Sequence, residues 1–356
     1  MKNFNEIFSK FDVCQKCAPY GNGHINDTYL VDECPRYILQ KINTSIFTDP
    51  DGLMNNIEAV TVHIKKKLVE AGRNPERETL TIIKTTDGKN YYRDNDGSVY
   101  RMYKFIEGAV SYDNIDSKEI LESAAKAFGE FQSMLSDFPA ETLSESIKDF
   151  HNTPKRFETL KRAISENKVG RLDSVRAEVD FALSFEKETD KVTSGIADGT
   201  IPLRVTHNDT KINNVLIDQI TKKGVAVIDL DTVMPGSLLY DFGDGLRTGG
   251  ATAAEDEKDL SKVGLNTELF ESYVKGFLSG IGDRICQREI ELLPYSVFLL
   301  TYECGIRFLT DYLDGDTYFK IHRPDHNLDR ARTQFKMCKD IISKYDELNA
   351  IVKKYV

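Results

Sequence analysis

The segment VTHNDTKINNVLID, residues 205–218, separates two short apolar runs with a dense set of polar side chains. An ordinary surface loop would contain Gly, Pro or Ser for turning, whereas this one contains acids, amides and a single lysine, Lys211, in a fixed order. Four of its side chains could bind a metal, a proton or the backbone: His207, Asn208, Asp209 and Asn214. The pattern therefore indicates a functional loop.

Short strands flank this loop. The segments RVTHND, NVLID and GVAVIDLD read as strands, and DQITKKG between the last two reads as a hairpin turn. Helical patterns fill the chain on both sides, from residue 107 to about 190 and again beyond 255. The first helix has an Asp116-x-x-Glu119 start signal and one apolar stripe, made of Ile120, Leu121, Ala124, Phe128, Phe131 and Leu135.

The first hundred residues have a different pattern. Strand-like segments alternate with Asp-Gly turn signals at 87–88 and 96–97; they are YILQKI (37–42), LTIIKT (80–85), KNYYRD (89–94) and SVYRMYKFI (98–106). A further apolar strand ends PYGNGHINDTYLV (19–31). Residues 54–72 have apolar side chains at helical spacing, with Gly72 as the stop. This pattern predicts a five-stranded antiparallel sheet interrupted by one helix.

Together these patterns predict an α+β fold with two lobes. The small β-rich lobe comprises residues 1–106 and contains one main helix, and the larger, mainly helical lobe comprises residues 107–356. The chain has no internal repeat and no low-complexity segment, which is why two lobes are the simplest division. A cleft between lobes is the natural place for a ligand.

Composition narrows the function. The chain has 356 residues, 40% of them hydrophobic, and a net charge of −10, so we expect an enzyme-sized protein without a broad surface for nucleic acid or anionic membranes. No apolar run approaches the roughly 20 residues of a membrane helix, and the start lacks a secretory apolar core, which favours a soluble cytoplasmic protein. Cys14 and Cys17 have no second pair at zinc-ligand spacing, so reduced structural thiols are expected.

The polar loop has the residue order needed for phosphoryl transfer. Asp209 is followed by Lys211 two residues later and Asn214 five residues later, which is the order of a kinase catalytic loop. Asp229 ends an apolar strand fifteen residues further on, where a carboxylate could hold the magnesium that bridges nucleotide phosphates. A base, two metal ligands and a cation are a sufficient set for this chemistry. The alternative is a loop whose Asp and Asn bond their own backbone, and for His207 we favour such a positioning role.

The N-terminal lobe offers less specific candidates. Gly21 and Gly23 suit a flap over phosphates, although Asn26 stands where a third glycine would be expected. The kinase pattern also requires a lysine on the strand YILQKI, paired with a glutamate on the next helix. Glu58 is the candidate glutamate, while Gln40 and Lys41 lie on opposite faces of the strand and leave the register open.

The chain resembles a known family. HNDTKINNVLID, followed by VIDLDTVMPGSLLYDFGDGLRTG, resembles the aminoglycoside phosphotransferase and choline kinase superfamily, and more closely the bacterial N-acetylhexosamine 1-kinases. The resemblance extends through PRYILQKINTSIF, SVYRMYKFIEGAVSY and ECGIRFLTDYLDGDTYF. It implies a protein-kinase-like fold, ATP and Mg²⁺, and transfer of the γ-phosphate to the anomeric hydroxyl of N-acetylglucosamine or N-acetylgalactosamine.

The resemblance also implies roles for individual residues. Asp209 resembles the base, and Asn214 and Asp229 resemble the metal ligands. Phe105 and Glu107 stand in the stretch that resembles the hinge beside adenine. The segments that resemble the sugar pocket contain Asp244, Arg307 and Tyr318, and His24 and Asn26 on the flap could reach the acceptor or the phosphates. Asp241 is expected to hold the catalytic loop instead.

Several alternatives stay open. Arg307 could be a structural ion pair and Tyr318 a core residue. The acceptor could be another small alcohol such as homoserine, choline or an aminoglycoside, because the catalytic loop fixes the donor chemistry and leaves the acceptor open. A non-catalytic pseudokinase is disfavoured because no base or metal residue is missing. The sequence does not decide the oligomeric state, and a monomer is compatible with it.

Overall fold

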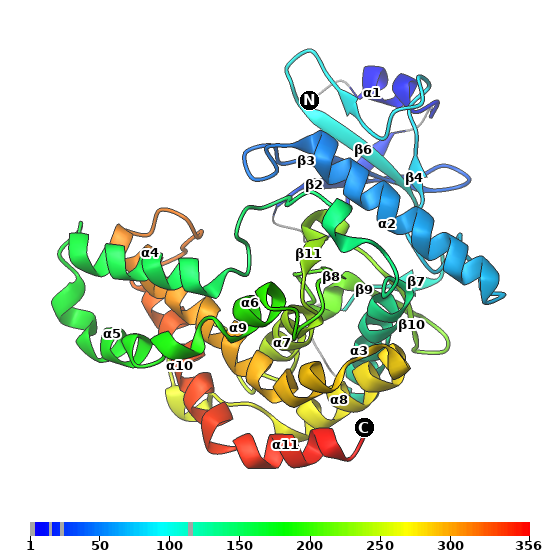
Figure 1. The fold of residues 1–356 in the computed structure, drawn as a ribbon. Coiled ribbons are helices and arrows are strands. Elements are labelled where there is room, and N and C mark those ends of the chain that lie inside the picture. Colours follow the sequence, from blue (N-terminus) through cyan, green and yellow to red (C-terminus); the bar gives the residue numbers. More distant parts are fainter. Residues whose placement is uncertain (1–3, 14–15, 22–24, 113–116) are drawn as a thin grey trace.

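A computed structural model describes residues 4–13, 16–21, 25–112 and 117–356. Its N-terminal part is a twisted antiparallel sheet, and helices form most of the remainder (Figure 1). Within the described residues the sheet has six strands: β1 (Cys17–Pro19), β2 (Asp27–Val31), β3 (Tyr37–Ile42), β4 (Ile82–Ile83), β5 (Tyr92–Arg93) and β6 (Val99–Lys104). Their order is β1-β2-β3-β6-β4, with β5 also paired to β6. The prediction of five strands was wrong by one, because β1 was not foreseen.

Each face of this sheet packs on a different helix. Leu39 and Tyr100 lie in a small core with α1 (Asn5–Lys10), whereas Ile42 and Val99 on the other face join the main core with α2 (Pro50–Glu70). The alternation follows from the pleat, which sends successive side chains to opposite faces. Helix α2 ends as predicted: Gly72 follows with φ +68°, a left-handed conformation that glycine adopts without steric cost.

The larger lobe is mainly helical (Figure 1). Its helices are α3 (Lys118–Met134), α4 (Thr153–Glu166), α5 (Arg176–Leu183), α6 (Lys191–Ala197), α7 (Leu238–Gly249), α8 (Thr267–Ile281), α9 (Gln287–Asp314), α10 (His326–Ser343) and α11 (Tyr345–Lys353). Its short strands are β7 (Ala109–Val110), β8 (Arg204–Thr206), β9 (Val215–Asp218), β10 (Gly224–Val227) and β11 (Met234–Gly236). The predicted hairpin is present as the antiparallel pair β9–β10. The two-lobed α+β fold is therefore confirmed.

Helix α3 begins one residue later than its predicted start signal would place it. The Ser117 side chain caps the helix by accepting from the backbone N–H groups of Glu119 and Ile120. Asp116 lies outside the described residues. The helix then packs so closely on α8 that a Cβ at Gly129 would lie 2.2 Å from the carbonyl oxygen of Phe277. This tight packing fixes the end of α3 that reaches the polar loop.

Helix α9 crosses the middle of the larger lobe. By length and composition alone it could span a membrane, but 89% of its most apolar window is buried inside the fold. A central core helix of a globular domain has the same properties. The helix therefore serves as the surface on which α4, α7 and α10 pack.

Candidate active site

Asp241, at the start of α7, binds the backbone of the polar loop. Its carboxylate accepts from the backbone N–H groups of His207 at 3.0 Å and Asn208 at 2.8 Å, and from Gln132 Nε2 at 2.6 Å. Burial raises the pKa of Asp241, and these hydrogen bonds oppose that shift by favouring the carboxylate. All of this carboxylate's contacts go to the loop and to α3. The prediction that Asp241 holds the loop is confirmed.

His207 is a buried positioning residue, as expected. Its Nε2 lies 2.8 Å from the carbonyl oxygen of Ile228, and its ring contacts the edges of Phe128 and Phe131 on α3. Nδ1 accepts from the backbone N–H of Asp209 at 3.3 Å. The ring thus ties the loop to the strand that leads to Asp229.

Asp209 projects from this scaffold with its side chain 26% exposed. Lys211 Nζ lies 3.0 Å from one carboxylate oxygen, and Asn214 Nδ2 lies 3.2 Å from the other. Asn214 Nδ2 also donates to the backbone carbonyl of Asp209 at 2.8 Å, which leaves its Oδ1 as the atom available to a cation. Burial acts to lower the pKa of Lys211, but the charges of Asp209 and Asp244 raise it above its usual value, so the ammonium form is maintained.

Asp229 lies directly after β10, in a left-handed conformation with φ 57°. Burial, followed by the charges of Asp231 and Asp209, raises its pKa to about 6. A carboxylate that is disfavoured as an anion by neighbouring anions is stabilised by a cation. The described residues contain no group of three or more His, Cys, Asp or Glu side chains able to hold a metal. A magnesium ion here would depend on Asn214, Asp229 and nucleotide phosphates together, which is how Mg²⁺ is usually bound.

A buried ion pair that the sequence did not predict joins the two lobes beside Asp229. Arg101 on β6 pairs with Asp231, and both side chains are almost completely buried. Gln40 Oε1 accepts from Arg101 Nε at 3.0 Å, and Asn26 Nδ2 donates to Asp231 at 2.6 Å. In the sequence this pair is marked by the second aspartate of VIDLD.

This arrangement shows on which face of the sheet Gln40 and Lys41 of β3 lie. Gln40 lies opposite Arg101 on the sheet face that meets α2 and Asp231. Lys41 lies opposite Tyr100, whose ring belongs to the core on the α1 side. Gln40 is thus the member of the pair that faces the second lobe.

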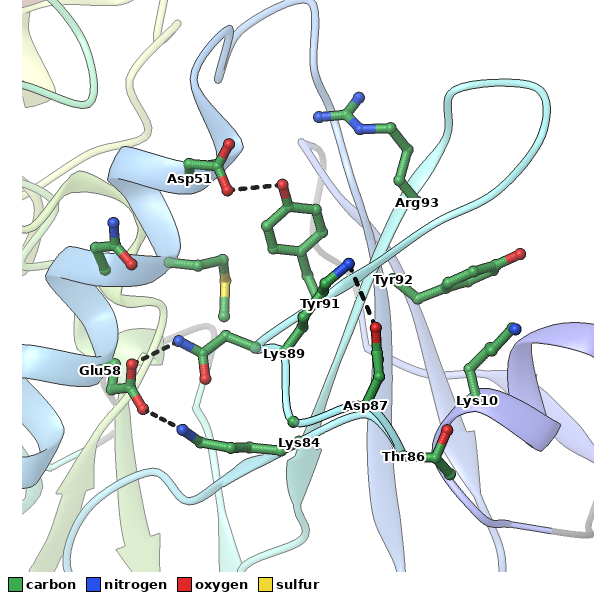
Figure 2. Close-up of a pocket in the computed structure, with 14 residues that line it drawn as sticks. Lys10, Asp51, Glu58, Lys84, Thr86, Asp87, Lys89, Tyr91, Tyr92 and Arg93 are labelled. Atoms are coloured by element: carbon green, nitrogen blue, oxygen red, sulfur yellow. Dashed lines mark hydrogen bonds and ion pairs between the residues drawn. The ribbon is translucent and has the colours of Figure 1, made fainter.

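The predicted pairing of Glu58 with a lysine on β3 is wrong. The Glu58 carboxylate pairs with Lys84 at 2.7 Å and accepts from Asn90 at 2.7 Å, and these contacts lower its pKa. Both partners lie on the segment between β4 and β5 and line, together with Glu58, a cavity of about 710 Å³. Figure 2 shows the Lys84 and Glu58 side chains pointing toward one another. Glu58 therefore contacts the segment after β4 instead of β3, and the cation that lies beside Gln40 of β3 is Arg101 of β6. Asp209 and Asp229 do not line this cavity.

Of the remaining nucleotide candidates, the structure describes Gly21, Phe105 and Glu107. Gly21 has φ +74°, while Gly23 and His24 lie outside the described residues, as does Cys14. The Arg36 guanidinium lies 4.3 Å from the centre of the Phe105 ring and forms an exposed ion pair with Glu107. Their roles toward a nucleotide stay predictions.

Among the acceptor-site candidates, Asp244 forms hydrogen bonds within the protein through both of its carboxylate oxygens. One carboxylate oxygen accepts from the backbone N–H of Thr210 at 3.0 Å, and the other accepts from Arg247 Nε at 3.0 Å. Burial acts to raise the pKa of Asp244, but the charges of Arg247 and Lys211 lower it below its usual value. Asp244 therefore supports the polar loop at a second point.

Arg307 and Tyr318 lie around an aromatic pair. The Arg307 guanidinium lies 5.8 Å from the ring centre of Phe150 and 5.5 Å from that of Phe319. Among the residues that the structure describes, Arg307 has no carboxylate within ion-pair distance. Tyr318 is 70% exposed, so it is not a core residue. Arg307 is therefore not held in a described ion pair, and the Tyr318 side chain is exposed to solvent.

Comparison with known proteins identifies the family. The profile of the phosphotransferase enzyme family (APH) matches residues 16–264, and the chain belongs to this family. An aminoglycoside phosphotransferase from Alicyclobacillus acidocaldarius has a similar structure, with a TM-score of 0.63 and 14% identity over 97% of this chain and 95% of that one. A microcompartment-associated aminopropanol kinase gives a TM-score of 0.60 and 15% identity over 97% of both chains. The amicoumacin kinase hAmiN, in complex with AMP-PNP, Ca²⁺ and Ami, has a TM-score of 0.56 and 14% identity over 92% of this chain and 88% of that one. At these identities the likeness shows the shared fold.

Proposed function

We propose that this member of the phosphotransferase enzyme family uses ATP and Mg²⁺ to phosphorylate the anomeric hydroxyl of N-acetylglucosamine or N-acetylgalactosamine. The observation that carries the kinase activity is the grouping of Lys211 and Asn214 on the two oxygens of Asp209, beside the electrostatically strained Asp229. Together these groups supply the base, the cation and the metal ligands that phosphoryl transfer requires.

The residues divide the reaction between them. Asp209 accepts the proton of the attacking hydroxyl, and Asn214 and Lys211 orient its carboxylate. Lys211 also places a positive charge where negative charge develops on the transferred group. Bound Mg²⁺ would neutralise phosphate charge, and the Asp229 carboxylate with Asn214 Oδ1 would hold it. Asp241, Asp244 and His207 keep the loop in register throughout.

The charges near Arg307 favour a neutral acceptor. Arg156 is partly buried nearby, and its pKa is lowered by that burial and then by the charge of Arg307. The described carboxylates around them are already committed: Glu303 to His151, Asp244 to Arg247, and Asp311 to Asn327 and the 317–319 backbone. A hydroxylated, uncharged ligand suits these donors, whereas a cationic ligand would need a free acid.

The second candidate is kinase activity on an amino alcohol or an aminoglycoside. The aminopropanol kinase and the aminoglycoside phosphotransferase with similar folds motivate it. Against it stand the two guanidinium groups named above, because amino alcohols and aminoglycosides are cations at neutral pH. The family as a whole leaves the acceptor open.

An acceptor panel tests the proposal. ATP consumption is measured with N-acetylglucosamine, N-acetylgalactosamine, glucose, galactose, homoserine, choline and kanamycin, and phosphorus NMR locates the phosphate. We expect both N-acetylhexosamines to rank above the unacetylated sugars, because unpaired buried polar groups penalise ligands that lack the acetamido group. The product should be an acid-labile 1-phosphate. An amino alcohol as the best acceptor, or phosphate on C6, would overturn the assignment.

A further inference from the structure

The peptide bond between Asn208 and Asp209 is held at both ends by imidazole rings. Its N–H donates to His207 Nδ1 at 3.3 Å, and its carbonyl oxygen lies 3.2 Å from Nε2 of His151. Asn208 has φ 66°, a left-handed conformation that is uncommon outside glycine. The peptide that carries Asp209 is thus fixed in a rare geometry from two sides. His207 belongs to the loop, whereas His151 reaches it from the segment before α4.

The two rings differ in their hydrogen-bond partners. His207 accepts at Nδ1, so its proton lies on Nε2, which faces the carbonyl oxygen of Ile228. His151 Nδ1 lies 2.8 Å from Glu303 Oε1, while its Nε2 faces the Asn208 carbonyl. Both partners of His151 are acceptors, and a neutral imidazole has only one N–H to offer. Only an imidazolium donates to both.

The surroundings of His151 suit a positive charge. Burial would raise the pKa of Glu303, but the charge and hydrogen bond of His151 lower it below its usual value, so Glu303 is a carboxylate. The rings of Phe150 and Tyr240 lie 4.7 Å and 5.1 Å from the imidazole and can stabilise a cation. The other charged groups of this neighbourhood are Arg156, Arg307 and Asp244. The His151 side chain is 7% exposed and that of Glu303 is 2% exposed, so the pair is shielded from water.

We propose that His151, as an imidazolium anchored by Glu303, is a positioning residue that fixes the Asn208 carbonyl and thereby the direction of Asp209. The proposal rests on the proposed function only for the role of Asp209 as base. It also connects α9, which carries Glu303 and Arg307, with the catalytic loop. Since misplacement of a reacting group by about 1 Å can cost roughly a hundredfold in rate, loss of this contact should appear in kcat.

Two substitutions separate the two contacts of the ring. Asn places an amide near the position of Nδ1, so His151→Asn keeps a donor for Glu303 and removes the one for Asn208. Gln places an amide near Nε2, so His151→Gln keeps the donor for Asn208. Thr153→Val is the matched control, because Thr153 Oγ1 donates to the other oxygen of Glu303 at 2.6 Å without touching the loop. kcat, the KM values of both substrates and Tm are measured for each variant.

We expect His151→Asn to lower kcat roughly ten- to hundredfold with KM for ATP unchanged, and His151→Gln and Thr153→Val to stay within about threefold of wild type. Equal losses in all three variants, or an unaffected His151→Asn, would overturn the proposal. If His151→Asn does not fold, ¹⁵N NMR of protein with labelled histidine rings measures the protonation of His151 directly. The His151 signal is assigned as the one that is missing from the spectrum of His151→Gln. Two protonated nitrogens support the proposal and a neutral ring overturns it. This spectrum needs no acceptor, so it remains decisive if no sugar is turned over by the wild-type enzyme.

Discussion

Each carboxylate oxygen of Asp209 has one described polar contact, Lys211 Nζ on one and Asn214 Nδ2 on the other. Asp209→Asn keeps the size of the side chain and removes its proton acceptor. Turnover should therefore fall by roughly two to four orders of magnitude, the range for loss of a general base, while ATP binding is retained. Steady-state kinetics and calorimetric nucleotide titration measure the two effects. Asp283→Asn, at an aspartate whose side chain is 93% exposed, is the control. Near-normal turnover in Asp209→Asn would contradict the role of base.

Asp229 links catalysis to pH-dependent stability. Without metal its pKa is about 6 in the folded protein, against a usual 3.8, so the folded state binds this proton more tightly than the unfolded state. The resulting stabilisation is complete below about pH 3.8 and is lost as pH rises through about 6. The Asp229→Asn variant has no ionisable group at this position, so its stability should not fall over this pH range. In chelator at pH 7.5 we expect this variant to be more stable than wild type by about 2–3 kcal/mol, since each pKa unit corresponds to about 1.4 kcal/mol.

Urea unfolding at several pH values in chelator measures this difference, which should shrink as pH falls toward 4. Adding Mg²⁺ and ATP should then stabilise the wild type and leave Asp229→Asn almost unchanged, because only binding to the folded state contributes. A variant that is less stable at pH 7.5, or a difference independent of pH, would show that Asp229 is not the strained group.

At the scale of elements, Arg101 and Asp231 join β6 to the turn that follows Asp229. Arg101→Met leaves the Asp231 carboxylate buried with only Asn26 as a described hydrogen-bond donor. Removing one partner of a buried ion pair usually costs about 3–5 kcal/mol, so the free energy of unfolding should fall by that order. Arg36→Met is the control, because it breaks the exposed Arg36–Glu107 pair and should cost less than about 1 kcal/mol. Urea unfolding compares the two, and equal costs would refute the structural role of the buried pair.

Local patterns predicted most elements of this fold. The strand Tyr37–Ile42 and the stop of α2 before Gly72 follow from alternation and from backbone sterics, which neighbouring residues decide. The strand Cys17–Pro19 escaped prediction because three residues that include a proline carry no strand pattern. The cap of α3 was misplaced by one residue, since Asp116 and Ser117 are both good caps and only the tertiary entry angle selects between them.

In the candidate site, too, some contacts could be predicted from the sequence and others could not. Asp209, Asn214 and Lys211 share one short loop, so their spacing in sequence survives as proximity in space. The partner of Glu58 depends on the rotation of α2 about its axis, which packing decides over the whole lobe. His151 is separated from Asn208 by more than fifty positions, and no pattern in the sequence marks it. Contacts of that kind come only from the assembled fold.

At the scale of the whole molecule, the main hydrophobic core crosses the predicted boundary at residue 106. The same cluster contains Ile42 and Ile57 from the first lobe and Leu121 and Phe128 from the second. Asn56 on α2 reinforces this continuity, since it donates to the carbonyl oxygens of Ser144 and Val233 and accepts from the N–H of Ser144. The two lobes are therefore parts of one cooperative structure.

Residues 1–106 should consequently fail to fold when produced alone, because α2 would expose the apolar face that the second lobe covers. The full chain should unfold in a single calorimetric transition whose van't Hoff and calorimetric enthalpies agree. Magnesium and ATP should raise the midpoint of that one transition, since the proposed site draws residues from the second lobe and Asp229 lies beside the Arg101–Asp231 pair. Circular dichroism of the 1–106 fragment and scanning calorimetry of the full chain measure these outcomes. A folded fragment, or two separate transitions of which nucleotide shifts only one, would show instead that the lobes are independent domains.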